Sequence, residues 1–152
     1  MFSWEEELDD VLSALKKTKG RITNVKELVL TGKISKQTHD SLMPQFQRDV
    51  VEVEKRKKDL LGRLTNLNSE LTEQYRVLLR LNSDLEMKLA YSLVSEDHYV
   101  KMATALKYGL EETVRELEGV SMAIKQLSEE AGGPTPHVLD RAIRRLDETG
   151  QT

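Results

Sequence analysis

Side chains that could perform chemistry are few in this sequence, and they are scattered. The three histidines, His39, His98 and His137, lack the spacing of metal ligands. The acidic stretch EEELDD at residues 5–10 lies at a predicted helix start, where carboxylates stabilise the positive helix end and have no cleft to work in. The GKIS stretch at residues 32–35 lacks the glycine framework of a phosphate loop. We therefore expect no enzyme activity, no cofactor and no metal.

A run of basic residues is the main candidate for contact with a polyanion. Lys55, Arg56 and Lys58 are the residues that would make this contact, with Lys57 between them. Aromatic side chains that could stack on bases are absent around the run. We favour a solvated helix face, which makes nucleic acid an unfavoured partner.

Composition narrows the class of protein. Charged residues make up 32% and aromatic residues only 5% of the 152 residues, a balance typical of long helices rather than of a broad globular core. The net charge of -3, the absence of cysteine and the lack of a long apolar run indicate a soluble cytoplasmic protein. Met1, Phe2 and Trp4 could form a small membrane wedge, but the glutamates beside them would be repelled by anionic lipid. Membrane contact stays open.

The sequence predicts long helices, and the first of them begins at Ser3. Ser3 and Glu6 match a capping box. A row spaced alternately by four and three residues follows and is interrupted only by Thr18; it comprises Trp4, Leu8, Val11, Leu15, Thr18, Ile22, Val25 and Val29. Gly32 is expected to end this helix.

A second helix is predicted from about residue 35 to 91, and a third after Ser95, ending at AGGPTP. The second sustains a heptad period, the strongest sequence signal for a coiled coil, although Pro44 predicts a kink or a short first segment. The apolar rows of these two helices form the predicted coiled-coil seam. Its residues are Leu60, Leu64, Leu67, Leu71, Leu78, Leu81, Leu85, Leu106, Leu110, Leu117, Ile124 and Leu127.

The two helix breaks share one pattern, GKIS at residue 32 and SLVS at residue 92, in which a branched residue precedes a capping serine. Each break predicts an αα-hairpin turn. Folding about the second turn places Gln74 opposite Thr113, and Lys57 near Glu130. Polar pairs at core positions set register in coiled coils, so we predict that these four residues form a polar register layer. The fold class is thus all-α: an elongated antiparallel coiled coil of three long helices, made of two hairpins that share the central helix, plus a short C-terminal helix.

The two predicted hairpins place both the first and the third helix against the same apolar row of the second helix, and both contacts extend as far as Leu60. Either their ends overlap there as a local three-helix bundle, or one helix is displaced and leaves an apolar row open. We therefore expect self-association, as a homodimer or a filament. Residues 1–132 form the predicted coiled-coil domain. Residues 133–152 form a flexible tail with a short amphipathic helix, whose candidate partner-docking residues are Leu139, Ile143 and Leu146.

The stretches LTGKISKQTHDSL and LAYSLVSEDHYVKMATAL, joined by a leucine-rich helix, resemble the coiled-coil region of the archaeal cell-division protein family CdvA. This resemblance covers about residues 25–127. It implies a filament-forming protein that acts with membrane at the division plane and recruits ESCRT-III-like subunits through a short C-terminal segment. The family typically has an N-terminal β-barrel; because this sequence starts directly with a predicted helix, we expect no barrel.

Three functions compete on these grounds. The leading one is a non-catalytic scaffold or filament similar to CdvA, with self-association and ESCRT-III-like division proteins as partners. The second is a discrete dimeric coiled-coil adaptor that holds protein partners at a fixed spacing. The third, which is less favoured, is an architectural nucleic-acid binder that uses the basic run.

Overall fold

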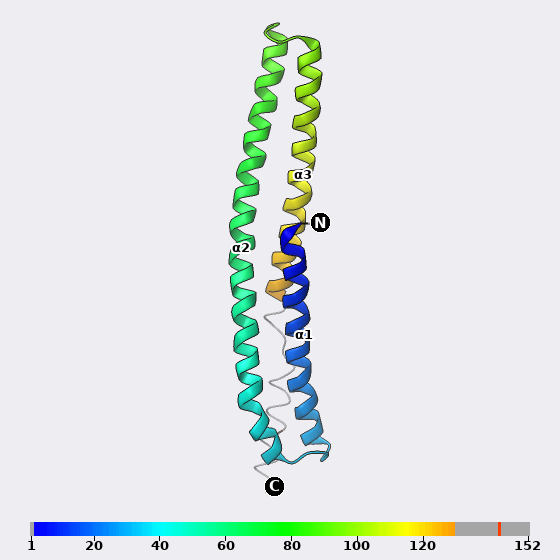
Figure 1. Cartoon of the computed structure of the whole chain (residues 1–152), viewed down its shortest axis with the longest axis vertical. Helices are drawn as coiled ribbons and strands as arrows, with labels where there is room; N and C mark the ends of the chain where they lie inside the picture. The colour runs from blue at the N-terminus through cyan, green and yellow to red at the C-terminus, as the bar shows by residue number, and fades with distance from the viewer. Residues whose placement is uncertain (1, 130–142, 144–152) are drawn as a thin grey trace. The chain divides into compact units, whose positions relative to one another are not determined.

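The computed structural model describes residues 2–129 and 143, and the secondary structure of these residues is helical. Three helices follow one another, α1 (Ser3–Leu30), α2 (Lys36–Ala90) and α3 (Glu96–Glu129), joined by two short turns (Figure 1). The all-α architecture of coiled-coil hairpins is therefore confirmed. The short C-terminal helix lies outside the described residues, apart from the helical Ile143.

The start of α1 differs from the predicted capping box. Phe2 occupies the N-cap position with no side-chain cap bond, and its carbonyl accepts the N–H of Glu5 at 3.1 Å. Ser3 is already helical, so its hydroxyl is one position too late to act as the cap. The ring of Phe2 stacks on that of Trp4 with centroids 5.8 Å apart, and Trp4 is 9% exposed. The capping-box prediction was wrong.

The turn after α1 is a Schellman motif, a hydrogen-bonded helix ending that requires one left-handed residue. The N–H of Lys33 donates to the carbonyl of Leu28 at 2.9 Å, and the N–H of Gly32 donates to that of Val29 at 3.1 Å. Gly32 has φ 76°, which glycine adopts without a steric penalty.

The turn after α2 repeats these bonds 60 positions later. The N–H of Leu93 donates to the carbonyl of Lys88 at 2.8 Å, and that of Ser92 to Leu89 at 3.0 Å. Here the left-handed residue is Ser92, with φ 58°, so a side chain occupies a backbone conformation that favours glycine.

A serine caps the helix after each turn, as the sequence predicts. Ser35 Oγ accepts the N–H of Thr38 at 3.1 Å, and Ser95 Oγ accepts the N–H of His98 at 3.2 Å. α2 then continues through Pro44, so no separate first segment exists. Pro44 lies eight residues inside α2, where its missing N–H removes one backbone hydrogen bond from a long ladder.

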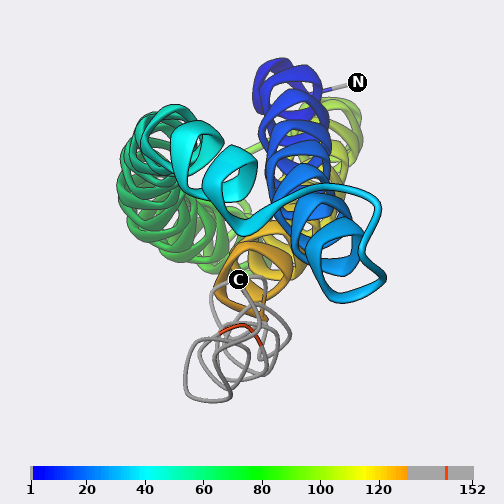
Figure 2. The same ribbon diagram turned by 90° about the horizontal axis from the view of Figure 1, so that it is seen from below.

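The chain packs as two units. Unit 1 contains the residues up to Leu61 together with the end of α3 from Gln126. It thus has three helical segments, one each from α1, α2 and α3, and Figure 2 views the molecule end on from the side where α2 begins. Its buried residues on α1 and α2 include Val11, Leu15, Lys26, Val53 and Leu60, and Leu127 of α3 is fully buried. The alternative of a local three-helix overlap at Leu60 is the one found.

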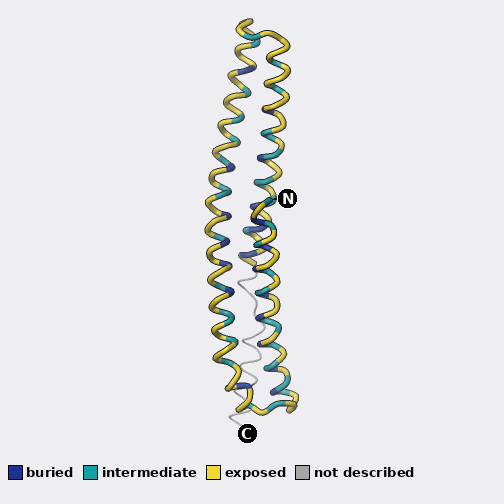
Figure 3. Tube along the Cα trace, viewed as in Figure 1, coloured by how far each residue is buried: buried dark blue, intermediate teal, exposed yellow. Residues whose placement is uncertain are grey.

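Unit 2 is an αα-hairpin made of the rest of α2 and α3, residues Gly62–Lys125. Buried positions recur at regular intervals along its helices, with exposed positions between them (Figure 3). The buried residues are Leu64, Leu71, Leu85, Leu106, Thr113, Val120 and Ala123. With only two helices, this unit has a narrow core and broad exposed flanks.

Candidate functional site

Reactive groups are dispersed among the described residues. No group of three or more His, Cys, Asp or Glu side chains in this part of the chain is arranged to hold a metal ion. His39 is 6% exposed and its Nδ1 lies 3.0 Å from Asp40, while His98 is exposed. His137 lies outside the described residues. The histidines of this part of the chain therefore lie apart from one another on α2 and α3.

The structure brings Gln74 and Thr113 together, as the hairpin register predicts. Gln74 Nε2 donates to Thr113 Oγ1 at 2.8 Å, and the hydroxyl of Thr113 donates in turn to the carbonyl of Gly109 at 2.7 Å. Thr113 is 2% exposed, so its polar atom is satisfied within the hairpin. Gly109 faces Leu78, since a Cβ added at Gly109 would lie 3.5 Å from Leu78 Cδ1. This neighbour agrees with the same register.

Of the other predicted polar pair, Lys57 and Glu130, the structure describes only Lys57. Lys57 is 5% exposed, and its Nζ lies 3.5 Å from Glu54 Oε2 one turn earlier on α2. Glu130 lies outside the described residues. The aliphatic stem of a buried lysine adds to the packing while its charge finds a carboxylate.

The predicted seam divides into three groups by exposure. Six residues are buried: Leu60, Leu64, Leu71, Leu85, Leu106 and Leu127. Five are half-buried: Leu67, Leu78, Leu110, Leu117 and Ile124. Leu81 is 47% exposed and lines a groove with Leu85 and Leu106, so it lies at the solvent edge of the seam. In a two-helix unit, one side of each seam row borders solvent because no third helix covers it.

Two buried positions were missed by the sequence pattern. Lys26 is 2% exposed, whereas the predicted neighbour Val25 is half-buried; Ala123 is 1% exposed, whereas Ile124 is half-buried. The steps Thr18–Ile22–Lys26 are both of four residues. A straight helix has 3.6 residues per turn, so a strict seven-residue period must slip at some point. Neither a lysine nor an alanine stands out as a core residue in a hydropathy pattern.

The basic run is split by its helix. Lys57 faces inward, while Lys55, Arg56 and Lys58 are exposed. These three residues thus remain available to solvent, as the favoured interpretation of a solvated face requires. Whether they contact a polyanion stays a prediction.

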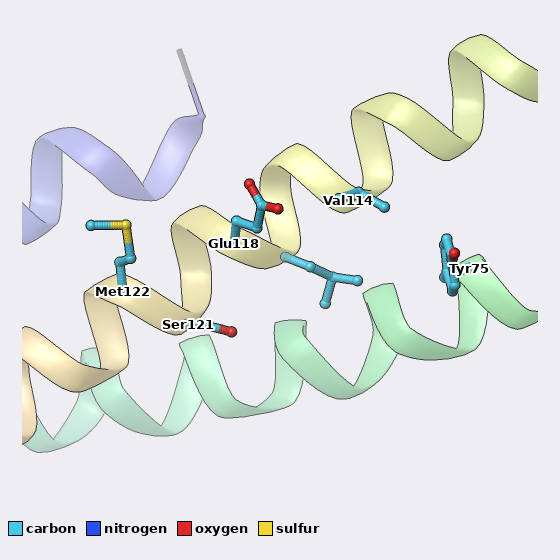
Figure 4. Close-up of a pocket in the computed structure, with 6 residues that line it drawn as sticks. Tyr75, Val114, Glu118, Ser121 and Met122 are labelled. Atoms are coloured by element: carbon cyan, nitrogen blue, oxygen red, sulfur yellow. The ribbon is translucent and has the colours of Figure 1, made fainter.

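An apolar groove lies on unit 2, on the flank where Tyr75 approaches α3. It has a volume of about 440 Å³ (Figure 4) and is lined by Tyr75, Val114, Leu117, Glu118, Ser121 and Met122. Met122 is 65% exposed and Val114 is 37% exposed. Apolar side chains this open are typical of surfaces that meet another protein.

The end of the unit 2 hairpin carries one perturbed group. The hydroxyl of Tyr99 donates to the carboxylate of Glu86. This hydrogen bond, followed by desolvation and by the charge of Glu86, raises the pKa of Tyr99 above its ordinary value of 10.0. The bond stabilises the neutral phenol, and it ties α2 to α3 close to the second turn.

Of the candidate docking residues in the tail, only Ile143 is described, and it is 5% exposed. Leu139 and Leu146 lie outside the described residues. Among the residues that the structure describes, no helix is long and apolar enough to cross a membrane.

These features define an all-α coiled-coil protein with exposed apolar side chains and a groove on its helix faces. Its sequence matches the family model described as the CdvA-like coiled-coil domain over residues 3–136. The chain belongs to this family. No curated protein and no solved structure matches it.

Proposed function

We propose that this protein is a non-catalytic scaffold of the archaeal ESCRT-type cell-division machinery, and that it assembles with copies of itself through its coiled coil. The observation that carries this proposal is the family match, which spans all three described helices. Helical hairpins form their backbone hydrogen bonds internally, and here they expose apolar side chains on their flanks. Such surfaces suit a protein that works by association. The proposed place of action is the cytoplasmic face of the division site.

The exposed apolar residues support self-association. They occur along both helices of unit 2, with Leu79 42% exposed, Met87 53% exposed and Tyr108 67% exposed. A small hairpin that left so much apolar surface to water would gain free energy by covering it. Self-association is the simplest way to do so, because every copy carries the same surface.

Recruitment of ESCRT-III-like division proteins is the proposed second activity. Its candidate site is the amphipathic segment with Leu139, Ile143 and Leu146, which has the spacing of a helix that docks in a groove. Binding of a purified ESCRT-III-like protein to the full chain, and its loss on the double change Leu139→Asp and Leu146→Asp, would test this assignment. A variant with Asp at exposed Ser83 serves as the charge control.

Sedimentation velocity over a wide range of protein concentration tests the scaffold. Species that grow without limit, together with filaments in electron micrographs, are expected for a filament. A plateau at a fixed small oligomer would instead favour the dimeric adaptor, and a monomer at every concentration would contradict both. Salt-dependent DNA binding that is lost on reversing the charges of Lys55, Arg56 and Lys58 would revive the nucleic-acid function.

A further inference from the structure

A second regular row of residues runs along α2 beside the buried row. Its members are spaced alternately by four and three positions, which places them on one face of the helix. All are exposed, and they are Glu70, Gln74, Val77, Leu81, Asp84 and Lys88. We call this the α2 stripe. Its middle is apolar, since Val77 is 40% exposed and Leu81 is 47% exposed.

The α2 stripe borders a groove of unit 2. Leu81 and Lys88 line a cavity of about 140 Å³ together with His98, Met102 and Leu106 of α3. Met102 is 42% exposed and widens the apolar part of this surface. A helix laid along the stripe would therefore contact α3 as well as α2.

The order of residue types along the stripe is self-complementary. Read in opposite directions, two copies place Val77 against Leu81, and Glu70 against Lys88. The same register places Gln74 against Asp84, where the amide N–H that is not bonded to Thr113 can donate to the carboxylate. A parallel pairing would instead place each charged residue against the same residue of the other copy, so that like charges would meet.

From this arrangement we infer that a second copy of the chain docks on the α2 stripe, antiparallel, about a two-fold axis level with Leu79. The inference rests on the proposed function, because it names the surface through which self-association begins. Neither Glu70 nor Lys88 has an ion-pair partner among the residues that the structure describes. Pairing of Glu70 with Lys88 of the other copy gives two equivalent salt bridges at the rim of the contact. Exposed salt bridges favour one orientation of the two copies more than they add affinity.

The surface is large enough for a specific contact. The stripe from Glu70 to Lys88 extends about 27 Å at 1.5 Å per residue. With the neighbouring α3 surface it is about 20 Å wide, so pairing buries on the order of 1,000 Å² over both copies, which is the lower end of specific interfaces. Such a two-fold contact uses the same surface on both copies and closes as a dimer. Longer assemblies then need another surface, for which the groove at Tyr75 and Met122 is available.

Charge reversal tests the pairing in the full-length chain. Glu70→Lys and Lys88→Glu should each weaken the dimer about tenfold in Kd, since each creates two repulsive contacts. The double variant should recover the wild-type Kd because it restores opposite charges. Ser83→Glu, on the opposite side of α2, is the matched control and should leave the Kd unchanged. Equal losses in the single and double variants would overturn the pairing.

Disulfide trapping tests the direction, because the sequence has no cysteine of its own. An oxidised mixture of the single variants Glu70→Cys and Lys88→Cys should give a mixed dimer. Either variant alone should not, because its two cysteines would lie about 27 Å apart, well beyond disulfide reach. Self-linked products would show a parallel pairing. A protein that still associates without any cross-link would overturn this interface alone, whereas a protein that never associates would overturn the proposed function as well.

Discussion

Gln74 and Thr113, 39 positions apart, are joined by a 2.8 Å hydrogen bond that ties α2 to α3. Gln74 itself is exposed, whereas Thr113 is 2% exposed, so the bond connects the solvated flank of the hairpin to its core. Thr113 also donates to Gly109 on its own helix. One buried hydroxyl thus joins the two helices in the alignment that the buried leucines also adopt.

A double-mutant cycle should measure this alignment bond. Gln74→Ala and Thr113→Val should each destabilise the hairpin, and together they should show a coupling free energy of about 0.5–1.5 kcal/mol, the usual net value of a hydrogen bond. Urea unfolding of the four proteins gives the coupling. Thr104→Val is the matched control, because Thr104 bonds only to Val100 on its own helix and should show no coupling to Gln74. An equally large coupling in the control would contradict the cross-helix bond.

Burial should separate two leucines of α2, of which Leu71 lies in the predicted seam and Leu79 lies outside it. Leu71→Ala removes a side chain that is 5% exposed and should lower the free energy of unfolding by about 2–4 kcal/mol. Leu79→Ala, at a position that is 42% exposed, should cost less than about 1 kcal/mol. Thermal unfolding at low protein concentration provides the comparison. Similar losses in the two variants would show that α2 is rotated relative to this structure.

The two turns should respond in opposite ways to glycine and alanine. Ser92→Gly relieves a left-handed residue with φ 58° and should stabilise the protein by about 0.5–1 kcal/mol after the added chain entropy is subtracted. Gly32→Ala introduces the same strain and should destabilise it by about 1–2 kcal/mol. Chemical denaturation measures both changes.

Gly20→Ala is the control for these substitutions. Gly20 lies inside α1 with no atom within 4 Å of an added Cβ, so alanine should stabilise the protein by up to about 1 kcal/mol through helix propensity. If Ser92→Gly lowers the stability while Gly20→Ala raises it, the left-handed turn at Ser92 is not the folded conformation.

The tyrosine at the end of unit 2 should make stability fall in alkali. Because folding raises the pKa of Tyr99, its contribution to stability is fully present below pH 10.0 and is lost as the pH rises through the higher folded value. Glu86→Gln removes both the charge and the carboxylate acceptor, so the pKa of Tyr99 should fall toward its ordinary value. NMR titration of the Tyr99 ring measures the shift. An unchanged titration curve in the variant would exclude the Glu86 bond.

The periodic pattern and turn residues account for much of the fold. Gly32, Ser35 and Ser95 mark helix ends for reasons of local geometry, so their neighbourhoods in sequence are sufficient to place them. The polar exceptions Gln74 and Thr113 could be matched because a hairpin turn fixes which residues face each other. Local rules failed at the start of α1, where Phe2, whose ring stacks on Trp4, occupies the N-cap position that the sequence pattern gives to Ser3.

The exposed flank was harder to foresee. A heptad pattern gives the direction of a side chain but not the number of neighbouring helices, and both two-helix and three-helix packing satisfy it. Leu60 is fully buried in a unit of three segments, whereas Leu81, in an equivalent heptad position, is 47% exposed in a unit of two. The α2 stripe depends on this difference, so it became visible only when exposure was known.

Trp4, the sole tryptophan, lies in unit 1 with its indole covered and its Nε1 lacking a hydrogen-bond partner. Its fluorescence should therefore be shifted to the blue and should follow the loosening of that unit alone. Circular dichroism follows all three helices together. Coincident curves from the two signals would mean that the chain melts in one cooperative step, and separated curves would mean that each unit has its own melting temperature.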